Sequence, residues 1–223
     1  GRKIRNSAIL AGLAFLFAMP LGIFFGVIAG LREGRLVDRI VSMGGLITAA
    51  SPDFATGILL IMIFSLKLKL LPGAAMFLND AGILSQPRMI ILPVLTASLV
   101  EIGYILRITR SSVVEVMQSN YVRTAVLKGL PYHKVVMGHV MRNSMLAPVT
   151  VIMLHVNWLI GGLVVVESVF GFPGLGSFIL NAALYKDVYA IEAGAMVLIV
   201  LAVGSQLIAD FIYSMLNPRI RYA

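Results

Sequence analysis

Residues 121–148 read YVRTAVLKGLPYHKVVMGHVMRNSMLAP, a basic, glycine-centred segment between long apolar runs. Its four Lys and Arg side chains require water, whereas 59% of the chain is hydrophobic and only 13% is charged. The mean hydropathy is +0.96, and a soluble globular protein has about 25% charged residues. The composition therefore predicts an integral membrane protein in which this segment lies in water beside the membrane.

Five apolar runs are long enough to cross a bilayer core, covering about residues 7–31, 40–66, 89–108, 145–166 and 191–216. A membrane-spanning helix needs about 20 residues. The second run is interrupted by Ala50-Ser51-Pro52-Asp53, where Pro should kink or break the helix. We therefore predict an all-α membrane protein with five visible spans in a single domain over residues 1–223.

The distribution of Lys and Arg predicts the orientation. Eleven of the eighteen lie in residues 32–39, residues 107–142 and the C-terminal tail, which share one side of the five-span topology. Basic loops are retained in the cytoplasm, so the basic excess needs no nucleic-acid partner and segment 121–148 is predicted to be cytoplasmic. Arg2, Lys3 and Arg5 conflict with this orientation because they precede the first span. Since the chain also begins with Gly1, we expect one further helix upstream.

Segment 121–148 contains the residues that typically begin and end two short helices. Ser119 and Asn120 are suited to a helix cap, Gly129 interrupts the first helix, and Pro131 suits the first turn of a second helix over about residues 132–145. Two helices joined at a glycine form a compact projection that can fill a groove in a cytoplasmic protein. The alternative is a basic amphipathic loop that lies on anionic lipid headgroups.

The spacing of particular residues carries a resemblance. Arg123-Thr124-Ala125 is followed after three residues by Gly129, and then by His139, Arg142-Asn143 and Pro148. Here the chain resembles the permease subunits of binding-protein-dependent ABC importers, in the dipeptide/oligopeptide/nickel branch. The segment is similar to that family's coupling loop, about residues 115–144. It departs from the general pattern because Arg123 replaces an acidic residue and Pro148 lies one residue later than in many relatives.

The resemblance extends over essentially the whole chain. It includes residues 20–32, VVESVFGFPGLG at residues 165–176, and NPRIR at residues 217–221. The resemblance implies a fold with six membrane helices, and we expect this chain to contain all but the first of them. The resemblance therefore implies the type I permease fold of ABC importers, in the bacterial or archaeal cytoplasmic membrane.

The resemblance also implies the partners. A second homologous permease completes the pore, two ATP-binding cassette ATPase subunits bind below it, and an extracytoplasmic solute-binding protein delivers substrate. ATP and Mg would be bound by the ATPase, so no cofactor is expected in this chain, which has no GxxxxGK[ST] loop. The residues assigned to ATPase coupling are Arg123, Thr124, Ala125, Gly129, His139, Arg142 and Asn143.

Polar residues inside the spans are candidates for the translocation path, namely Glu101, Asp53 and Asn157. Glu101 either lines the pore or pairs with Arg107, since an ionisable residue inside a membrane is costly and often functional. Asp53 either meets a solute or completes the broken helix at Pro52. Asn157 shares a helix with His155 and Trp158, and hydrogen bonds between helices are the commoner reason for such residues.

No metal or catalytic site is predicted. The chain has no Cys, and His155 has no second His or carboxylate at helical spacing. Glu167, at an external helix end, is predicted to be a satisfied interfacial charge in preference to a substrate contact. The glycines of residues 171–176 are predicted to allow a sharp turn. Gly22/Gly26/Gly30 and Gly161/Gly162 are predicted to allow close helix packing, including contact with a second permease.

Two other functional classes stay open from the residues alone. An ion-coupled secondary transporter also has broken helices and acids inside the membrane, but it usually shows two similar halves, which are not found here. An intramembrane enzyme needs convergent catalytic groups, and Glu101, His155 and Asp210 form no known spacing. The substrate stays undecided among dipeptides, longer peptides, nickel complexes, glutathione and opine-like compounds.

Overall fold

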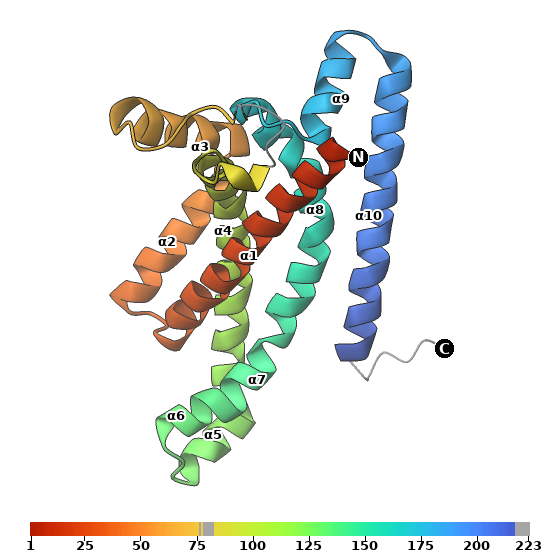
Figure 1. Ribbon diagram of the computed structural model, residues 1–223. Helices are drawn as coiled ribbons and strands as arrows, with labels where there is room; N and C mark the ends of the chain where they lie inside the picture. Colours follow the sequence, from red (N-terminus) through yellow and green to blue (C-terminus); the bar gives the residue numbers. More distant parts are fainter. Residues whose placement is uncertain (76, 78–82, 217–223) are drawn as a thin grey trace. The chain divides into compact units, whose positions relative to one another are not determined.

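The computed structural model describes residues 1–75, 77 and 83–216, and every regular element in these ranges is a helix (Figure 1). The predicted all-α class is confirmed. The long helices are α1 (Arg2–Leu31), α4 (Arg88–Met117), α8 (Leu146–Phe170) and α10 (Val188–Leu216). The shorter ones are α2 (Leu36–Ala50), α3 (Asp53–Leu60), η1 (Ile61–Lys67), η2 (Ile83–Ser85), α5 (Asn120–Leu127), α6 (Tyr132–Val135), η3 (Val136–Val140), α7 (Met141–Ser144) and α9 (Leu175–Leu184).

Each predicted span falls on helical structure. By length and hydropathy, four stretches of the described residues are able to cross a membrane, and six if the pairs interrupted after Ala50 and after Phe170 each count as one span. The second predicted span is interrupted at Ser51-Pro52, as expected from the Pro. The count of five spans stays a prediction.

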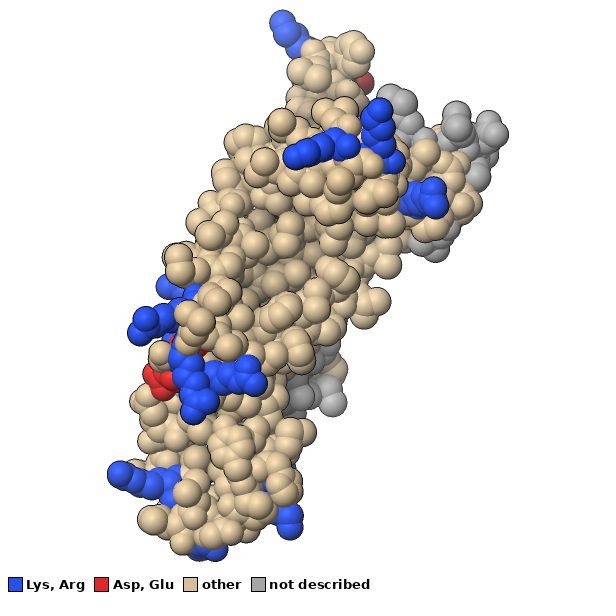
Figure 2. All heavy atoms as spheres, turned by 90° about the vertical axis from the view of Figure 1, so that its left-hand side faces the viewer, with Lys and Arg blue, Asp and Glu red and all other residues tan. Residues whose placement is uncertain are grey.

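On the face shown in Figure 2, Lys and Arg side chains stand out from a surface that is otherwise largely uncharged.

The chain divides into two compact units. Unit 1 contains residues 1–16, 51–100 and 153–223, and unit 2 contains residues 17–50 and 101–152. Helices α1, α4 and α8 each contribute residues to both units.

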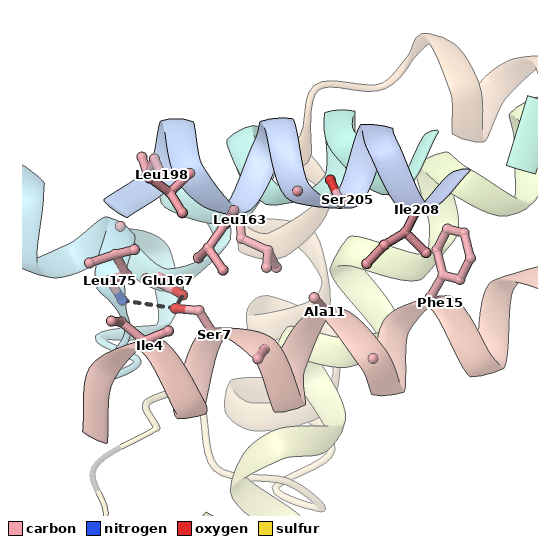
Figure 3. Close-up of a pocket in the computed structure, with 16 residues that line it drawn as sticks. Ile4, Ser7, Ala11, Phe15, Leu163, Glu167, Leu175, Leu198, Ser205 and Ile208 are labelled. Atoms are coloured by element: carbon pink, nitrogen blue, oxygen red, sulfur yellow. Dashed lines mark hydrogen bonds between the residues drawn. The ribbon is translucent and has the colours of Figure 1, made fainter. Parts of the chain in front are cut away.

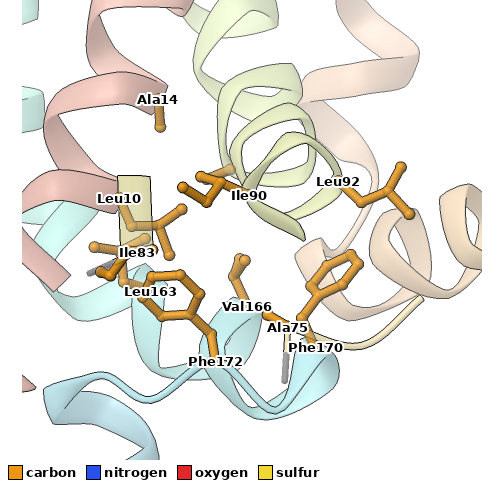
Figure 4. Packing of buried hydrophobic residues seen from close by; sticks show 11 residues of the cluster. Leu10, Ala14, Ala75, Ile83, Ile90, Leu92, Leu163, Val166, Phe170 and Phe172 are labelled. Atoms are coloured by element: carbon orange, nitrogen blue, oxygen red, sulfur yellow. The ribbon is translucent and has the colours of Figure 1, made fainter. Parts of the chain in front are cut away.

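Unit 1 is built around an apolar core. Phe170 and Phe172 are almost fully buried in it, and they lie on either side of Gly171, whose φ is +62°. Such a φ favours glycine, which has no Cβ. The ring of Phe172 packs edge-to-face on Phe77, and the Ala75 N–H donates to the Phe170 carbonyl at 2.7 Å. Other members of this core are Leu10, Ala14, Ile83, Ile90, Leu92, Ala97, Leu163 and Val166 (Figure 4).

Unit 2 is held together by close helix contacts at glycine. Gly22, Gly26 and Gly30 of α1 face Ile105, Thr109 and Val113 of α4, and a Cβ added to any of these glycines would lie 2.5–2.7 Å from the facing side chain. On another side of α4, a Cβ on Gly103 would lie 2.6 Å from the Thr48 hydroxyl of α2. Small residues allow helices in a membrane to approach closely. The packing role predicted for Gly22, Gly26 and Gly30 is confirmed, and their contacts are with α4 of the same chain. The roles of Gly161/Gly162 and the contact with a second permease stay predictions.

Candidate functional site

Residues 118–131 connect α4 to the second helix of the predicted coupling segment, which we define as residues 115–144. Ser119 precedes α5 in an extended conformation, as predicted for a cap. Its hydroxyl, however, donates backward to the Val116 carbonyl at 2.5 Å and makes no cap bond to α5. Gly129 follows α5 with φ +76°, and Pro131 directly precedes α6. The helix–glycine–helix arrangement is therefore as predicted.

The second helix of the coupling segment is longer than α6 alone. Helices α6, η3 and α7 follow one another without a gap from Tyr132 to Ser144, with a π-helical turn at Val136–Val140. The sequence predicted a helix over this range but not the π-helical turn. Such turns are often found at functional sites because they displace the side chains that follow.

The two helices of the coupling segment enclose a small apolar core of their own. Val122 and Ala125 of α5 are 2% and 5% exposed, and they cluster with Val135 of α6, Val140 of η3 and Val113 of α4. Val27, Leu31, Val116, Met117 and Met145 pack around this cluster. The segment is therefore fixed to unit 2 by apolar packing as well as by its chain ends, so that a force on one helix reaches the other.

The outer face of the coupling segment combines apolar and basic side chains. Leu127 is 81% exposed and Met137 69%, although both are large apolar residues. Val126, Leu130 and Tyr132 are also exposed. Arg123, Lys128, His133, Lys134 and Arg142 of the same segment are also exposed. Large exposed apolar side chains together with polar ones are typical of a protein–protein interaction surface.

The residues assigned to coupling do not all share this face. Arg123, Thr124, Gly129, Arg142 and Asn143 are exposed, and His139 is half-buried. The Thr124 hydroxyl donates to the Asn120 carbonyl at 2.9 Å, and the Asn143 amide donates to the His139 carbonyl at 2.8 Å.

Ala125 differs because it is buried in the core of the segment. Its position favours a packing role, in which a small residue lets α5 lie close to its neighbours.

The candidates for the translocation path are spread over several helices. Glu101 is fully buried on α4, whereas Arg107 is exposed. Asp53 is half-buried in the first turn of α3, where a negative charge is favourable at a helix N-terminus. The side chains of Asn157 and Asp210 lie outside those that the structure describes. The assignment of Glu101, Asp53 and Asn157 to the path stays a prediction.

An ion pair that the sequence analysis missed ties α2 to α4. The Asp38 carboxylate of α2 accepts from Arg110 Nε at 2.5 Å and from Nη2 at 2.8 Å, and also from the Gly34 N–H at 2.9 Å and the Ser42 hydroxyl at 3.0 Å. The Asp38 side chain is 4% exposed and that of Arg110 31%. The only indication in the sequence was that the two opposite charges lie near the ends of two neighbouring apolar runs. The residues are 72 apart along the chain, so no local pattern pairs them.

Glu167 is a second residue whose environment the sequence did not specify. It is fully buried in unit 1, and its carboxylate accepts hydrogen bonds from Ser7 of α1 and from the Ser177 N–H of α9. The prediction of a satisfied charge is consistent with these bonds, but the group is buried inside the chain and not at an interface with water. The sharp turn predicted for the glycine-rich stretch is present, since the end of α8 and α9 meet at 78°.

Comparison with known proteins connects this geometry to a family. Residues 22–222 match the family described as "binding-protein-dependent transport system inner membrane component". The chain belongs to this family. The match includes the whole coupling segment, and it makes the chain a permease of a multi-component transport system in a membrane.

Curated relatives of this permease agree with the assignment. It is 36% identical over 215 residues to a putative peptide transport system permease protein of Brucella abortus (strain 2308), covering 96% of this chain and 68% of the relative. It is 33% identical to the oligopeptide transport system permease protein AppB of Bacillus subtilis (strain 168), covering 99% and 70%. It is 32% identical to the dipeptide transport system permease protein DppB of Escherichia coli (strain K12), covering 94% and 68%.

A solved structure shows the same fold. The permease superposes on the crystal structure of an amino acid ABC transporter with histidines with a TM-score of 0.68, covering 98% of this chain and 92% of that one. The two sequences are 13% identical, so the likeness concerns the fold alone. The type I permease fold that the resemblance implied is confirmed.

Proposed function

We propose that this permease forms the pore of an ATP-driven importer of peptides in the cytoplasmic membrane of a bacterium or archaeon. The observation that carries the proposal is the family match over residues 22–222, which includes the helix–glycine–helix coupling segment. Peptides are the proposed substrate class because relatives that cover nearly the whole chain are peptide, oligopeptide and dipeptide permeases by name.

The proposed mechanism is alternating access driven from the cytoplasmic side. ATP binding by the ATPase closes its two subunits, and that closure moves the coupling segment with the helices on which it packs. Leu127 and Met137 are exposed on the same segment as several basic side chains, and such a segment is suited to enter a groove on the ATPase. ATP and Mg are bound by the ATPase, so this chain supplies the path and no nucleotide chemistry.

The proposed assembly contains two ATPase subunits, a second homologous permease and an extracytoplasmic solute-binding protein. Two permeases are needed because alternating access requires a path that is enclosed on all sides within the bilayer. Neither the fold nor the relatives support the ion-coupled alternative.

The test is reconstitution of the permease in liposomes with an ATPase, a second permease and a binding protein. Uptake of labelled di- and oligopeptides is measured with and without ATP, in the presence and absence of a proton gradient. We expect uptake that requires ATP and the binding protein. Peptide uptake by the permease alone, driven by the gradient, would overturn the proposal.

A further inference from the structure

Residues 167–177, at the end of α8, read ESVFGFPGLGS, and the structure gives this stretch a specific packing role. Glu167 lies one turn before the end of α8, and the chain then turns through Phe172 and Pro173 into α9. The Phe172 N–H donates to the Glu167 carbonyl at 2.8 Å, and this bond closes the turn. As a result, the Glu167 side chain is directed back at the first residues of α9.

Groups from α1 and α9 bond to the Glu167 carboxylate of α8, and Figure 3 shows Ser7, Glu167 and Leu175 of this network. The Ser7 hydroxyl of α1 donates to one carboxylate oxygen, and the Ser177 N–H of α9 donates to the other at 3.0 Å. Ser7 in turn accepts from the Leu175 N–H at 2.8 Å. Two of the N–H groups that α9 cannot satisfy internally are therefore bonded to side chains of α8 and α1, and the carboxylate lies at the positive end of α9.

Glycine makes room for this carboxylate. A Cβ on Gly174 would collide with the carboxylate of Glu167 itself, and a Cβ on Gly176 would lie 2.5 Å from the Val164 Cα of α8. The neighbouring Asn6 is 4% exposed, and its amide donates to the Pro173 carbonyl at 2.9 Å. Buried hydrogen bonds to a charged group are among the stronger ones in proteins, and here they join elements that lie about 160 residues apart in the chain.

We propose that Glu167 is a positioning residue that clamps α9 to the first two turns of α1, and that this clamp stays closed throughout the transport cycle. The clamp consists of Ser7, Glu167, Gly174, Leu175 and Ser177. The proposal rests on the proposed function, since it assigns α9 a fixed place in an importer whose other helices move. A closed clamp follows from the geometry because opening it would leave a buried carboxylate without its donors.

The first arm of the test measures whether the clamp stays closed. The chain has no Cys, so thiols introduced into it are its only ones, and cysteine-free partner subunits are used. Lys3 Nζ of α1 lies 4.7 Å from the ring centre of Phe178 of α9. The double variant Lys3→Cys/Phe178→Cys is joined by a short, reducible bis-methanethiosulfonate reagent. We expect ATP-dependent peptide uptake to be unchanged by the cross-link, with each single variant treated in the same way as control.

Loss of uptake on cross-linking, restored by a reducing agent, would overturn the proposal because it would show that α9 must leave α1. This arm retains Glu167 and does not depend on the folding of a Glu167 variant.

The second arm measures what holds the clamp. Leu175 is 5% exposed, so Leu175→Cys reports opening by its rate of labelling with a membrane-impermeant maleimide. Glu167→Ala and Gly174→Ala, each combined with this reporter, should raise the labelling rate by about tenfold, as expected for loss of hydrogen bonds to a buried charge. Peptide uptake should fall as the labelling rate rises. Glu167→Gln should give an intermediate labelling rate, because its amide oxygen still accepts hydrogen bonds. Gly204→Ala is the matched control, because Gly204 lines the same cavity of about 460 Å³ as Ser7 and Glu167, and nothing lies within 4 Å of the added Cβ.

Unchanged labelling in both Glu167→Ala and Gly174→Ala would also overturn the proposal. Labelling is independent of the substrate, so it reports on the clamp even if the parent protein transports no peptide. In that case the proposed function would fail while the clamp would stand.

Discussion

Gly26 of α1 lies directly against Thr109 of α4, because a Cβ added to Gly26 would be 2.5 Å from the Thr109 Cβ and 2.7 Å from the Leu106 carbonyl oxygen. The same relationship recurs one turn earlier at Gly22 and one turn later at Gly30. The residue numbers rise together on the two helices, so α1 and α4 run in the same direction along this contact. Glycine at every fourth residue is what allows the two backbones to approach so closely.

Replacing Gly26 with Leu should separate α1 from α4. Overpacking a close contact typically costs about 1–3 kcal/mol, and here the clash includes backbone, which cannot rotate away. We expect a lower unfolding midpoint in a detergent titration, and less protein in the membrane. Gly12→Leu on the same helix is the control, since nothing lies within 4 Å of a Cβ at Gly12. Equal loss in both variants would mean that α1 tolerates no added bulk anywhere, and that the contact is not special.

Replacing Gly129 with Val should uncouple the permease from its ATPase. The φ of +76° at Gly129 is strained for a β-branched residue, at a cost on the order of 1–3 kcal/mol. Nothing lies within 4 Å of a Cβ at this position, so the effect would come from the backbone and not from a clash. ATP-dependent uptake should be abolished while membrane insertion is retained.

Gly129→Asn separates backbone conformation from side-chain size, because Asn adopts positive φ more readily than other residues. We expect it to retain more uptake than Gly129→Val. If both variants transport as well as the parent, the turn at Gly129 does not transmit the motion of the ATPase.

Separating Asp38 from Arg110 should loosen α2 from α4. Loss of a hydrogen bond to a charged group costs about 1.5–3 kcal/mol, and Asp38→Asn leaves the guanidinium without its carboxylate. The unfolding free energy of Asp38→Asn, Arg110→Gln and the double variant gives the coupling between the two side chains. We expect the double variant to lose less than the sum of the single variants. Strict additivity would show that the pair contributes nothing beyond its separate residues.

Leu127→Ser should weaken the binding of the ATPase to the permease. Leu127 is 81% exposed on the coupling segment, and a large apolar side chain at the centre of an interface commonly contributes more than 1 kcal/mol to binding. Co-purification of the ATPase and ATPase activity in the assembled complex measure the effect. Leu184→Ser of α9 is the control, since Leu184 is 70% exposed but lies outside the coupling segment. An equal loss of ATPase in the control would argue against Leu127 as a contact.

Local sequence patterns were enough to predict the helices of the coupling segment, because its structure depends on residues that are close together in the sequence. Gly129 with Pro131 predicted where one helix ends and the next begins, and the structure has the break at these residues. The role of Ser119 was only partly predictable, since its hydroxyl bonds to Val116 in place of capping α5. That choice depends on the exact path of the chain between two helices, which composition does not encode.

The contacts of Glu167 were beyond sequence reasoning for a different reason. Its nearest partners are Ser177, ten residues away, and Ser7, 160 residues away. Neither distance corresponds to a helical period, so no pattern along the chain connects them. No pattern along the chain connects Asp38 with Arg110 either, or indicates which helix the glycines of α1 contact.

By itself, the sequence determined that this protein is an all-helical membrane protein, that its basic glycine-centred segment forms two short helices, and which family it belongs to. These features follow from hydropathy, from the backbone preferences of Gly and Pro and from short spacings, all of which act locally. Only the tertiary structure decided which helices Gly26 and Asp38 contact, and that Glu167 is buried against the start of α9. Those outcomes depend on which distant segments pack against each other. A carboxylate is desolvated, and a glycine allows a close contact, only after that packing has formed.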